Sequence, residues 1–127
     1  MTVLIVDDNA GVRRLLRGVA VEVAAGVWEC SDGADALAAY TAHRPSVVLM
    51  DIRMPRMDGL AAARQIMAAY PAARVVMVTD YDDDTLRAAA HEAGACAYML
   101  KVDLLDLGAL IHSVATGSGA WQERLDQ

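Results

Sequence analysis

The chain has 127 residues, of which 56% are hydrophobic, so it is long and apolar enough for one compact domain and is not a disordered chain. Its formal net charge of −6 argues against a nucleic-acid-binding surface, which would be basic. No apolar run approaches the roughly 20 residues that span a bilayer, and the N-terminus lacks the pattern of a signal peptide. We therefore expect a cytoplasmic protein that does not contact membranes.

Short apolar segments alternate with helical patterns along the chain, which predicts buried parallel strands joined by helices. The five expected strands cover residues 3–6, 27–30, 47–50, 75–78 and 95–100. Right-handed crossovers between such strands give a doubly wound sheet. The predicted fold is therefore α/β and flavodoxin-like, with a five-stranded parallel sheet in the order 2-1-3-4-5 and helices on both faces.

Apolar residues at helical spacing follow each expected strand. The five helices are marked, in chain order, by residues 12–23, the alanine-rich segment that ends near 43, residues 60–67, an acidic start at 82–85, and residues 107–114. Asn9 or Asp8 can cap the first helix. We expect residues 1–116 to form the domain, and residues 117–127, which begin Gly-Ser-Gly, to form a linker or C-terminal tail.

Cysteine and histidine residues give no sign of a disulfide or a zinc site. Cys30 and Cys96 belong to the second and fifth expected strands, which lie at opposite edges of the predicted sheet. Free thiols agree with a cytosolic setting. The three histidines are scattered without the spacing of metal ligands, so they are interpreted as surface or partly packed residues.

Polar residues stand where four of the strands end. Asp7 and Asp8 follow the first strand, Asp51 the third, Thr79 the fourth and Lys101 the fifth. Ligands of open parallel sheets bind beyond the carboxyl ends of the strands, at the point where the strand order reverses. The acidic pair alone is equally explained by helix capping, but together with Asp51 it predicts a site for Mg²⁺, with Mn²⁺ as an alternative.

The same set of residues can support phosphoryl transfer. A carboxylate at Asp51 can attack a phosphoryl donor and form an aspartyl-phosphate. A metal ion would neutralise the transferring group, while Lys101 and Thr79 would contact its oxygens. Taken singly, Thr79 or Lys101 would be an ordinary residue at the end of a strand.

These segments resemble the receiver domain of bacterial two-component response regulators from the first residue to about residue 116. The matching segments are VLIVDDN, LMDIRMPRMDG, VVMVT and AYMLK. The resemblance implies that Asp51 is the phosphoacceptor and that Thr79 and Lys101 bind the phosphoryl group. It also implies that Asp8, Asp51 and the backbone carbonyl of Arg53 bind the metal directly, and that Asp7 supports it through water.

The resemblance further implies a switch and partners. Thr79 would move toward the phosphate, Tyr98 would turn inward, and the surface of the fourth helix, fifth strand and fifth helix would change. A half-buried strand aromatic is the alternative for Tyr98. The implied partners are a sensor histidine kinase and, on phosphorylation, a second copy in a homodimer. Arg13, Arg14 and Arg17 on the first helix form a candidate kinase-docking surface or a solvated basic face.

Two positions depart from the family. Asp80 replaces the usual small residue after the threonine, so we expect it to repel a phosphodonor, unless it points outward and caps the fourth helix. Val102 stands where many members have a proline after the lysine, so a cis bond is not assumed there.

Three functions remain open on the sequence. The first is a phosphorylation-dependent signalling switch, which is not an enzyme beyond its own phosphorylation and slow dephosphorylation. The second is a receiver-like interaction module that works without phosphate, for which Asp80 is the sequence support. The third is a small phosphohydrolase, against which the chain shows no cap insertion and no separate general acid. The fifth strand and helix resemble receivers that precede a helix-turn-helix domain, so we expect control of transcription, with DNA bound only by an output domain absent from this chain.

Overall fold

The computed structural model describes residues 1–123, in which six parallel strands form one sheet in the order β2-β1-β3-β4-β5-β6. The strands are β1 (Thr2–Val6), β2 (Gly26–Cys30), β3 (Val47–Met50), β4 (Val75–Thr79), β5 (Ala97–Leu100) and β6 (Gln122–Glu123). The first five follow the predicted order 2-1-3-4-5, and the α/β prediction is confirmed. The short β6 is an addition that the sequence analysis did not anticipate.

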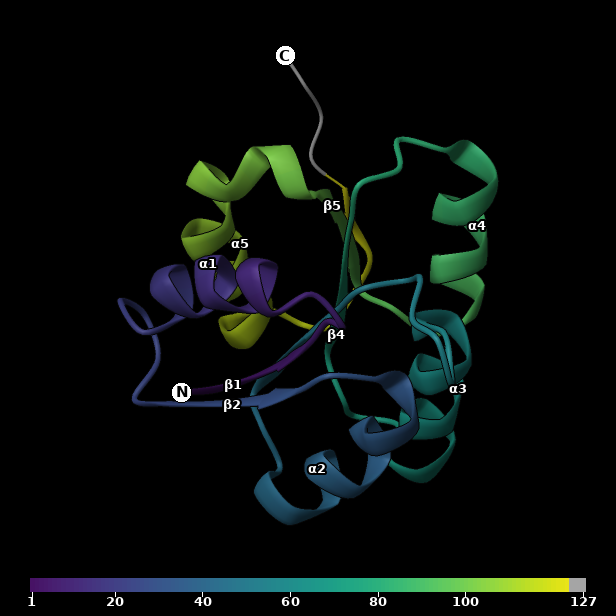
Figure 1. The fold of residues 1–127 in the computed structure, drawn as a ribbon, viewed down its shortest axis with the longest axis horizontal. Coiled ribbons are helices and arrows are strands. Elements are labelled where there is room, and N and C mark those ends of the chain that lie inside the picture. Colours follow the sequence, from purple (N-terminus) through teal and green to yellow (C-terminus); the bar gives the residue numbers. More distant parts are fainter. Residues whose placement is uncertain (124–127) are drawn as a thin grey trace.

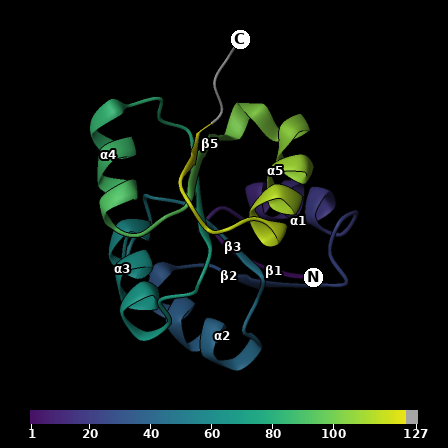
Figure 2. The same cartoon turned by 180° about the vertical axis from the view of Figure 1, so that it is seen from behind.

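Helices cover both faces of the sheet (Figures 1 and 2). They are α1 (Ala10–Ala20), α2 (Ala36–His43), α3 (Gly59–Ala69), α4 (Asp84–Glu92) and α5 (Leu107–Thr116), with the 3₁₀ turns η1 (Gly33–Asp35) and η2 (Lys101–Asp106). α1 and α5 lie on one face, and α2, α3 and α4 lie on the other. Asn9, rather than Asp8, caps α1, because its side-chain oxygen accepts a hydrogen bond from the Val12 N–H at 3.0 Å.

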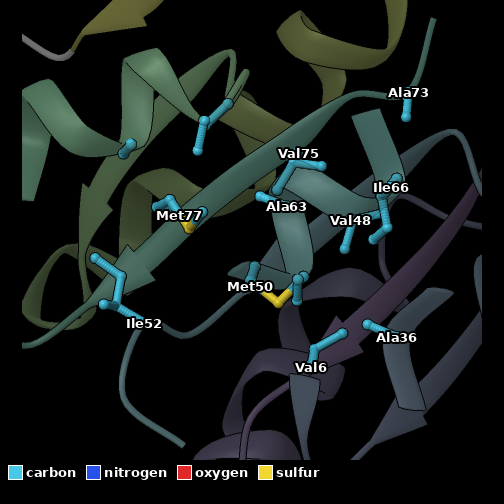
Figure 3. Packing of buried hydrophobic residues seen from close by; sticks show 14 of the residues in the cluster. Val6, Ala36, Val48, Met50, Ile52, Ala63, Ile66, Ala73, Val75 and Met77 are labelled. Carbon is cyan, nitrogen blue, oxygen red and sulfur yellow. The ribbon is translucent and has the colours of Figure 1, made fainter. Parts of the chain in front are cut away.

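Alternate residues of each central strand enter two separate hydrophobic cores. Figure 3 shows the core beneath α2 and α3, to which Val48 and Met50 of β3, Met77 of β4 and Ile66 of α3 all belong. The other core lies on the opposite face of the sheet, where Leu49 of β3 packs with residues of α1 and α5. A continuous apolar run thus serves both faces, as expected for parallel strands buried on both sides.

The end of the described chain returns to the sheet beside β5. The backbone N–H of Gln122 donates to the Cys96 carbonyl at 2.6 Å, and β6 pairs with Ala97 and Tyr98 of β5. Part of the segment predicted as a linker or tail therefore adds a strand in this structure, although residues 124–127 of that segment lie outside the described residues.

The two cysteines are both free, one at the end of β2 and one directly before β5. Strands β1, β3 and β4 separate them, as the strand order predicted. Within residues 1–123, each helix is too short or too polar to cross a bilayer.

Candidate functional site

Three carboxylates meet where β1 and β3 end. The two strands are neighbours, with Val6 paired to Met50, so the residues that follow them emerge side by side. One carboxylate oxygen from each of Asp7, Asp8 and Asp51 lies within 4.8 Å of the others. The structure therefore brings together the three acids that the sequence predicted as a cluster.

The burial of these acids is unequal. Asp7 is fully buried and Asp51 is 8% exposed, whereas Asp8 is exposed. Asp7 Oδ1 accepts a hydrogen bond from the Asn9 N–H at 2.8 Å, while its buried Oδ2 faces the Lys101 ammonium. Such crowded carboxylate oxygens fit a hard divalent cation with oxygen ligands.

Lys101 is the cation that contacts this cluster in the described structure. Its Nζ lies 2.9 Å from Asp7 Oδ2 and 3.3 Å from Asp51 Oδ1. Burial acts to lower the pKa of Lys101, but the hydrogen bond to Asp7 and the charge of Asp51 outweigh burial and raise that pKa above its ordinary value. The ammonium group is therefore charged at neutral pH and faces the predicted phosphoryl position.

Asp51 is the acid whose ionisation is most affected. Burial and the neighbouring charge of Asp7 raise the pKa of Asp51 to about 6, against the opposing effects of Lys101 and the Ile52 N–H. That N–H donates to Asp51 Oδ1 at 2.9 Å. A cation bound beside Asp51 would favour its ionised form, which is the form that can act as a nucleophile.

Gly59, in the Asp58-Gly59 pair that follows Asp51, is required for a steric reason. The Gly59 N–H donates to the Ile52 carbonyl at 2.7 Å, and a Cβ at position 59 would overlap the carbonyl oxygen of Asp51. Asp58 caps α3, since its side chain accepts from the Ala61 N–H at 2.8 Å. The pair thus returns the chain closely over the strand end that presents Asp51.

Asp32 anchors the loop that carries Arg53, a role that the sequence analysis missed. Its carboxylate is 4% exposed and accepts hydrogen bonds from the Arg56 and Met57 N–H groups, both at 3.0 Å, and from the Ala34 N–H at 2.9 Å. Burial alone would raise the pKa of Asp32, but these three bonds hold it below its ordinary value. The signal in the sequence is the Asp32-Gly33 pair, which is typical of a turn and does not by itself indicate such an anchor.

Arg53 and Tyr81 form a contact between the loops that follow β3 and β4. The Arg53 guanidinium carbon lies 4.6 Å from the Tyr81 ring centroid. The two residues are each two positions beyond a predicted site residue, Asp51 and Thr79. Their stacking places an arginine and an aromatic ring beside the acidic cluster, which residue patterns alone did not predict.

Thr79 and Tyr98 are linked through the backbone of Tyr81. Thr79 is fully buried, and its Oγ1 accepts a hydrogen bond from the Tyr81 N–H at 3.3 Å. Tyr98 is 3% exposed, and its hydroxyl donates to the Tyr81 carbonyl at 2.5 Å. The Tyr98 ring therefore points inward in this structure, beside the strand end that carries Thr79.

Asp80 does not cap α4. Its side chain is 69% exposed, and Oδ2 lies 3.9 Å from Lys101 Nζ. Asp83 caps that helix instead, by accepting from the Leu86 N–H at 3.0 Å, so the capping alternative for Asp80 is wrong. The peptide bond between Lys101 and Val102 is trans. Lys101 thus has a third carboxylate neighbour at the outer side of the cluster.

The basic residues of α1 are not equivalent. Arg13 and Arg17 form ion pairs with Glu29 of β2 at 3.2 and 2.9 Å, and Arg13 also donates to the Asp7 carbonyl at 2.7 Å. Arg14 is exposed. Two of the three predicted docking residues therefore also hold α1 against β2.

Comparison with known proteins agrees with this arrangement. Residues 3–113 match the family model of the response regulator receiver domain. The chain belongs to this family. It is 38% identical over 103 residues to the transcriptional regulatory protein PdtaR of Mycobacterium tuberculosis, a match that covers 78% of this chain and 48% of PdtaR. It is 45% identical over 98 residues to a protein-glutamate methylesterase/protein-glutamine glutaminase of Hahella chejuensis, covering 75% of this chain and 28% of that protein.

The fold is also similar to that of solved response regulators. A two-component response regulator of the LuxR family from Aurantimonas superposes with a TM-score of 0.87 at 27% identity, covering 97% of this receiver and 88% of that chain. The receiver spans about half of PdtaR and less than a third of the methylesterase. The output activities of those longer proteins are therefore not carried over to this chain.

Proposed function

We propose that this receiver is a phosphorylation-dependent signalling switch that accepts a phosphoryl group on Asp51 from a sensor histidine kinase. The observation that carries the proposal is the position of Asp51. Its carboxylate lies at the carboxyl end of the central strand, 3.3 Å from Lys101 Nζ and within 4.8 Å of the Asp7 and Asp8 oxygens.

The donor set fits a resident Mg²⁺, with Mn²⁺ as an alternative. The carboxylates of Asp8 and Asp51 and the backbone carbonyl of Arg53 would hold the ion, and Asp7 would support it through water. When bound, the ion neutralises the charge of the phosphoryl group. The three carboxylates, whose oxygens lie within 4.8 Å of one another, support this assignment.

Phosphoryl transfer needs a nucleophile and a positive environment, and this chain supplies both. A carboxylate oxygen of Asp51 forms a bond to phosphorus while the phosphorus–nitrogen bond of the kinase phosphohistidine breaks, and the electron pair of that bond stays on the imidazole. The Lys101 ammonium and the Thr79 hydroxyl then contact the phosphoryl oxygens of the new acyl phosphate. The same mixed anhydride is later hydrolysed by water, which returns the switch to its starting state.

The proposed kinase-docking surface lies beside this site, on α1 and the turn after β5. Leu15 is 58% exposed, Val102 84% and Leu105 fully exposed, and α1 and α5 pack side by side on this face of the sheet (Figure 1). Exposed large apolar side chains beside an exposed arginine, Arg14, suit a partner helix bundle with an apolar and acidic face.

The proposed response passes through Thr79 and Tyr98 to the surface of α4, β5 and α5. We infer that this surface controls transcription through an output domain that would contact DNA, and that phosphorylation favours a homodimer. The transcriptional regulator among the relatives supports this output. The two free thiols agree with the proposed cytoplasmic setting.

A phosphate-independent interaction module is the second candidate, favoured by the contact between Asp80 and Lys101. In that case the carboxylate of Asp80 would take the place of a phosphoryl oxygen as a partner of the ammonium, 3.9 Å away.

Intact mass spectrometry tests both functions. The protein is incubated with Mg²⁺ and a small acyl phosphate, alongside Asp51→Ala, Asp80→Ala and the remote control Glu92→Gln. One phosphoryl adduct on wild type and Glu92→Gln, absent from Asp51→Ala and from reactions with a chelator, is the expected result. An adduct on Asp80→Ala alone would show an intact but blocked site, and no adduct on any variant would favour the phosphate-independent module.

A further inference from the structure

The segment that ends the described chain covers the outer side of β5 and α4. Beyond the β6 pairing, the indole of Trp121 packs against His91 of α4, with ring centroids 4.6 Å apart. The Ser113 hydroxyl of α5 also donates to the Gln122 side-chain oxygen at 2.8 Å. The segment thus contacts α4, β5 and α5 together, and Figure 2 shows it in yellow between α4 and α5.

Trp121 closes one side of a hollow on α4. The hollow measures about 250 Å³ and is lined by Asp84, Arg87, Ala88, His91 and Trp121. Four of these residues come from successive turns of one helix face, and the fifth is the tryptophan of the returning segment. The hollow is therefore formed only while this segment lies on α4.

Arg87 connects this hollow to the predicted switch residue. Its guanidinium carbon lies 4.7 Å from the Tyr98 ring centroid, and it forms ion pairs with Asp82 at 3.0 Å and Asp84 at 3.1 Å. The Arg87 side chain is 21% exposed. One arginine therefore contacts the ring of Tyr98 and also lines the surface on which Trp121 rests.

We propose that α4 and the edge of β5 form a docking surface for the chain's own residues 121–123, and that phosphorylation of Asp51 strengthens this docking through Tyr98 and Arg87. The coupling rests on the proposed phosphorylation, whereas the docking itself does not. In this structure the inward Tyr98 ring and the docked segment occur together, on either side of Arg87.

The direction of the coupling follows from the hydrogen bonds of Thr79. A hydroxyl can donate to a phosphoryl oxygen while it still accepts the Tyr81 N–H. Phosphorylation would then fix the Tyr81 backbone, whose carbonyl holds the Tyr98 hydroxyl. A fixed Tyr98 ring holds Arg87 in place, and the surface under Trp121 is stabilised. Because such coupling is reciprocal, removal of residues 121–123 should make the phosphorylated state less stable.

Fluorescence of a single tryptophan tests the docking without phosphate. Trp28→Phe leaves Trp121 as the only fluorophore of its kind and keeps a ring to stack on His43. In this background Arg87→Met should raise acrylamide quenching of Trp121 about twofold, because the arginine that lines its surface is lost. Arg64→Met on the exposed side of α3 is the matched control and should change nothing. Quenching of Trp121 in the parent protein as strong as that of a free tryptophan amide would overturn the docking, and equal quenching in all three proteins would overturn the part of Arg87 in it.

The coupling is tested in the same background with Mg²⁺ and an acyl phosphate, and adduct formation is followed by intact mass. Quenching of Trp121 should fall about twofold when the adduct forms, and Arg87→Met should form the adduct without this change. An adduct without any change in wild-type quenching, or a change that persists in Arg87→Met, would overturn the coupling. Absence of an adduct would overturn the proposed function and the coupling with it, while the quenching of Trp121 without phosphate would still decide the docking.

Discussion

The Arg53 guanidinium stacks on the Tyr81 ring, 4.6 Å from its centroid, and joins the loops that follow β3 and β4. Asp51 and Thr79 end the strands from which these loops start. Two side chains that are not themselves proposed to touch the phosphoryl group thus connect the loops beside the proposed phosphorylation site.

The stack should slow hydrolysis of the aspartyl-phosphate. Tyr81→Ala should raise the hydrolysis rate about two- to fivefold, since an exposed cation–π contact contributes about 0.5–1 kcal/mol. In an Arg53→Met background the same substitution should have a smaller effect, because the contact is already lost. Decay of the adduct mass over time measures both rates.

The Arg44–Tyr70 pair, with 4.2 Å between guanidinium carbon and ring centroid, provides a matched control away from the acidic cluster. Tyr70→Ala should leave the hydrolysis rate unchanged. Additive effects of Tyr81→Ala and Arg53→Met would contradict the idea that the two side chains act as one barrier.

Asp51→Asn should stabilise the metal-free protein at pH 8 by about 1–3 kcal/mol, since each unit of pKa shift corresponds to about 1.4 kcal/mol. The folded-state pKa of Asp51, about 6, exceeds its ordinary value of 3.8. The wild-type contribution of Asp51 is therefore most favourable below pH 4 and is lost as pH rises through 6. Asparagine carries no charge at either pH.

Urea unfolding in a chelator at pH 4 and pH 8 measures this difference, with Glu92→Gln as the control. The advantage of Asp51→Asn should shrink at pH 4, and Mg²⁺ at pH 8 should stabilise wild type more than the variant. An advantage that stays the same at both pH values would show that ionisation of Asp51 is not its cause.

Asp32→Ala should lower the free energy of unfolding by about 2–3 kcal/mol, because hydrogen bonds to a charged acceptor are strong and three backbone donors lose their partner. It should also weaken Mg²⁺ binding, because the loop that carries Arg53 loses its anchor. The pKa of Asp32 is depressed, so its contribution is present above the ordinary pKa and is lost as pH falls through the folded-state value.

Chemical unfolding and calorimetric Mg²⁺ titration test both statements. Asp35→Ala is the comparison, because Asp35 is exposed and its ion pair with Arg56, at 2.7 Å, lies in solvent. Unaltered Mg²⁺ affinity in Asp32→Ala would show that the metal site does not depend on this anchor.

Asp80→Ala should accelerate phosphorylation by an anionic donor about two- to fivefold at low salt, with a smaller difference at high salt, because exposed charges are screened. The substitution removes a negative charge and frees Lys101 from its outermost carboxylate neighbour. Initial rates of adduct formation at two salt concentrations measure the effect. Glu22→Ala removes an exposed acid elsewhere and should not alter the rate; a matching increase there would point to net charge alone.

The order of the strands and the meeting of their terminal residues were predictable from the sequence. Apolar runs of the right length define parallel strands, and parallel strands end at one edge, so Asp7, Asp51, Thr79 and Lys101 had to lie near each other. The register that makes Val6 and Met50 neighbours then places the two acids side by side.

The contacts made by loop side chains were not predictable in this way. Asp32 accepts a hydrogen bond from a residue more than twenty positions later, in the loop after β3, and no periodic pattern in the sequence predicts this contact. Asp80 and Asp83 belong to one acidic run, and only the backbone path decides which of them caps α4. Trp121 is an aromatic residue in a short terminal segment of the sequence. Its contact with His91 of α4 depends on the backbone path that brings this segment back to β5.

The pairing of β6 with β5 also changes which strand edge of the sheet is open to other chains. An exposed strand edge is a template for pairing with a neighbouring molecule and for aggregation. In the described part of the chain, β6 covers β5, so β2 is the other outer strand. Glu29 of β2 is held by Arg13 and Arg17, and these charges disfavour a further strand there. Loss of the C-terminal segment should therefore leave a receiver that still folds but is more prone to aggregate through β5.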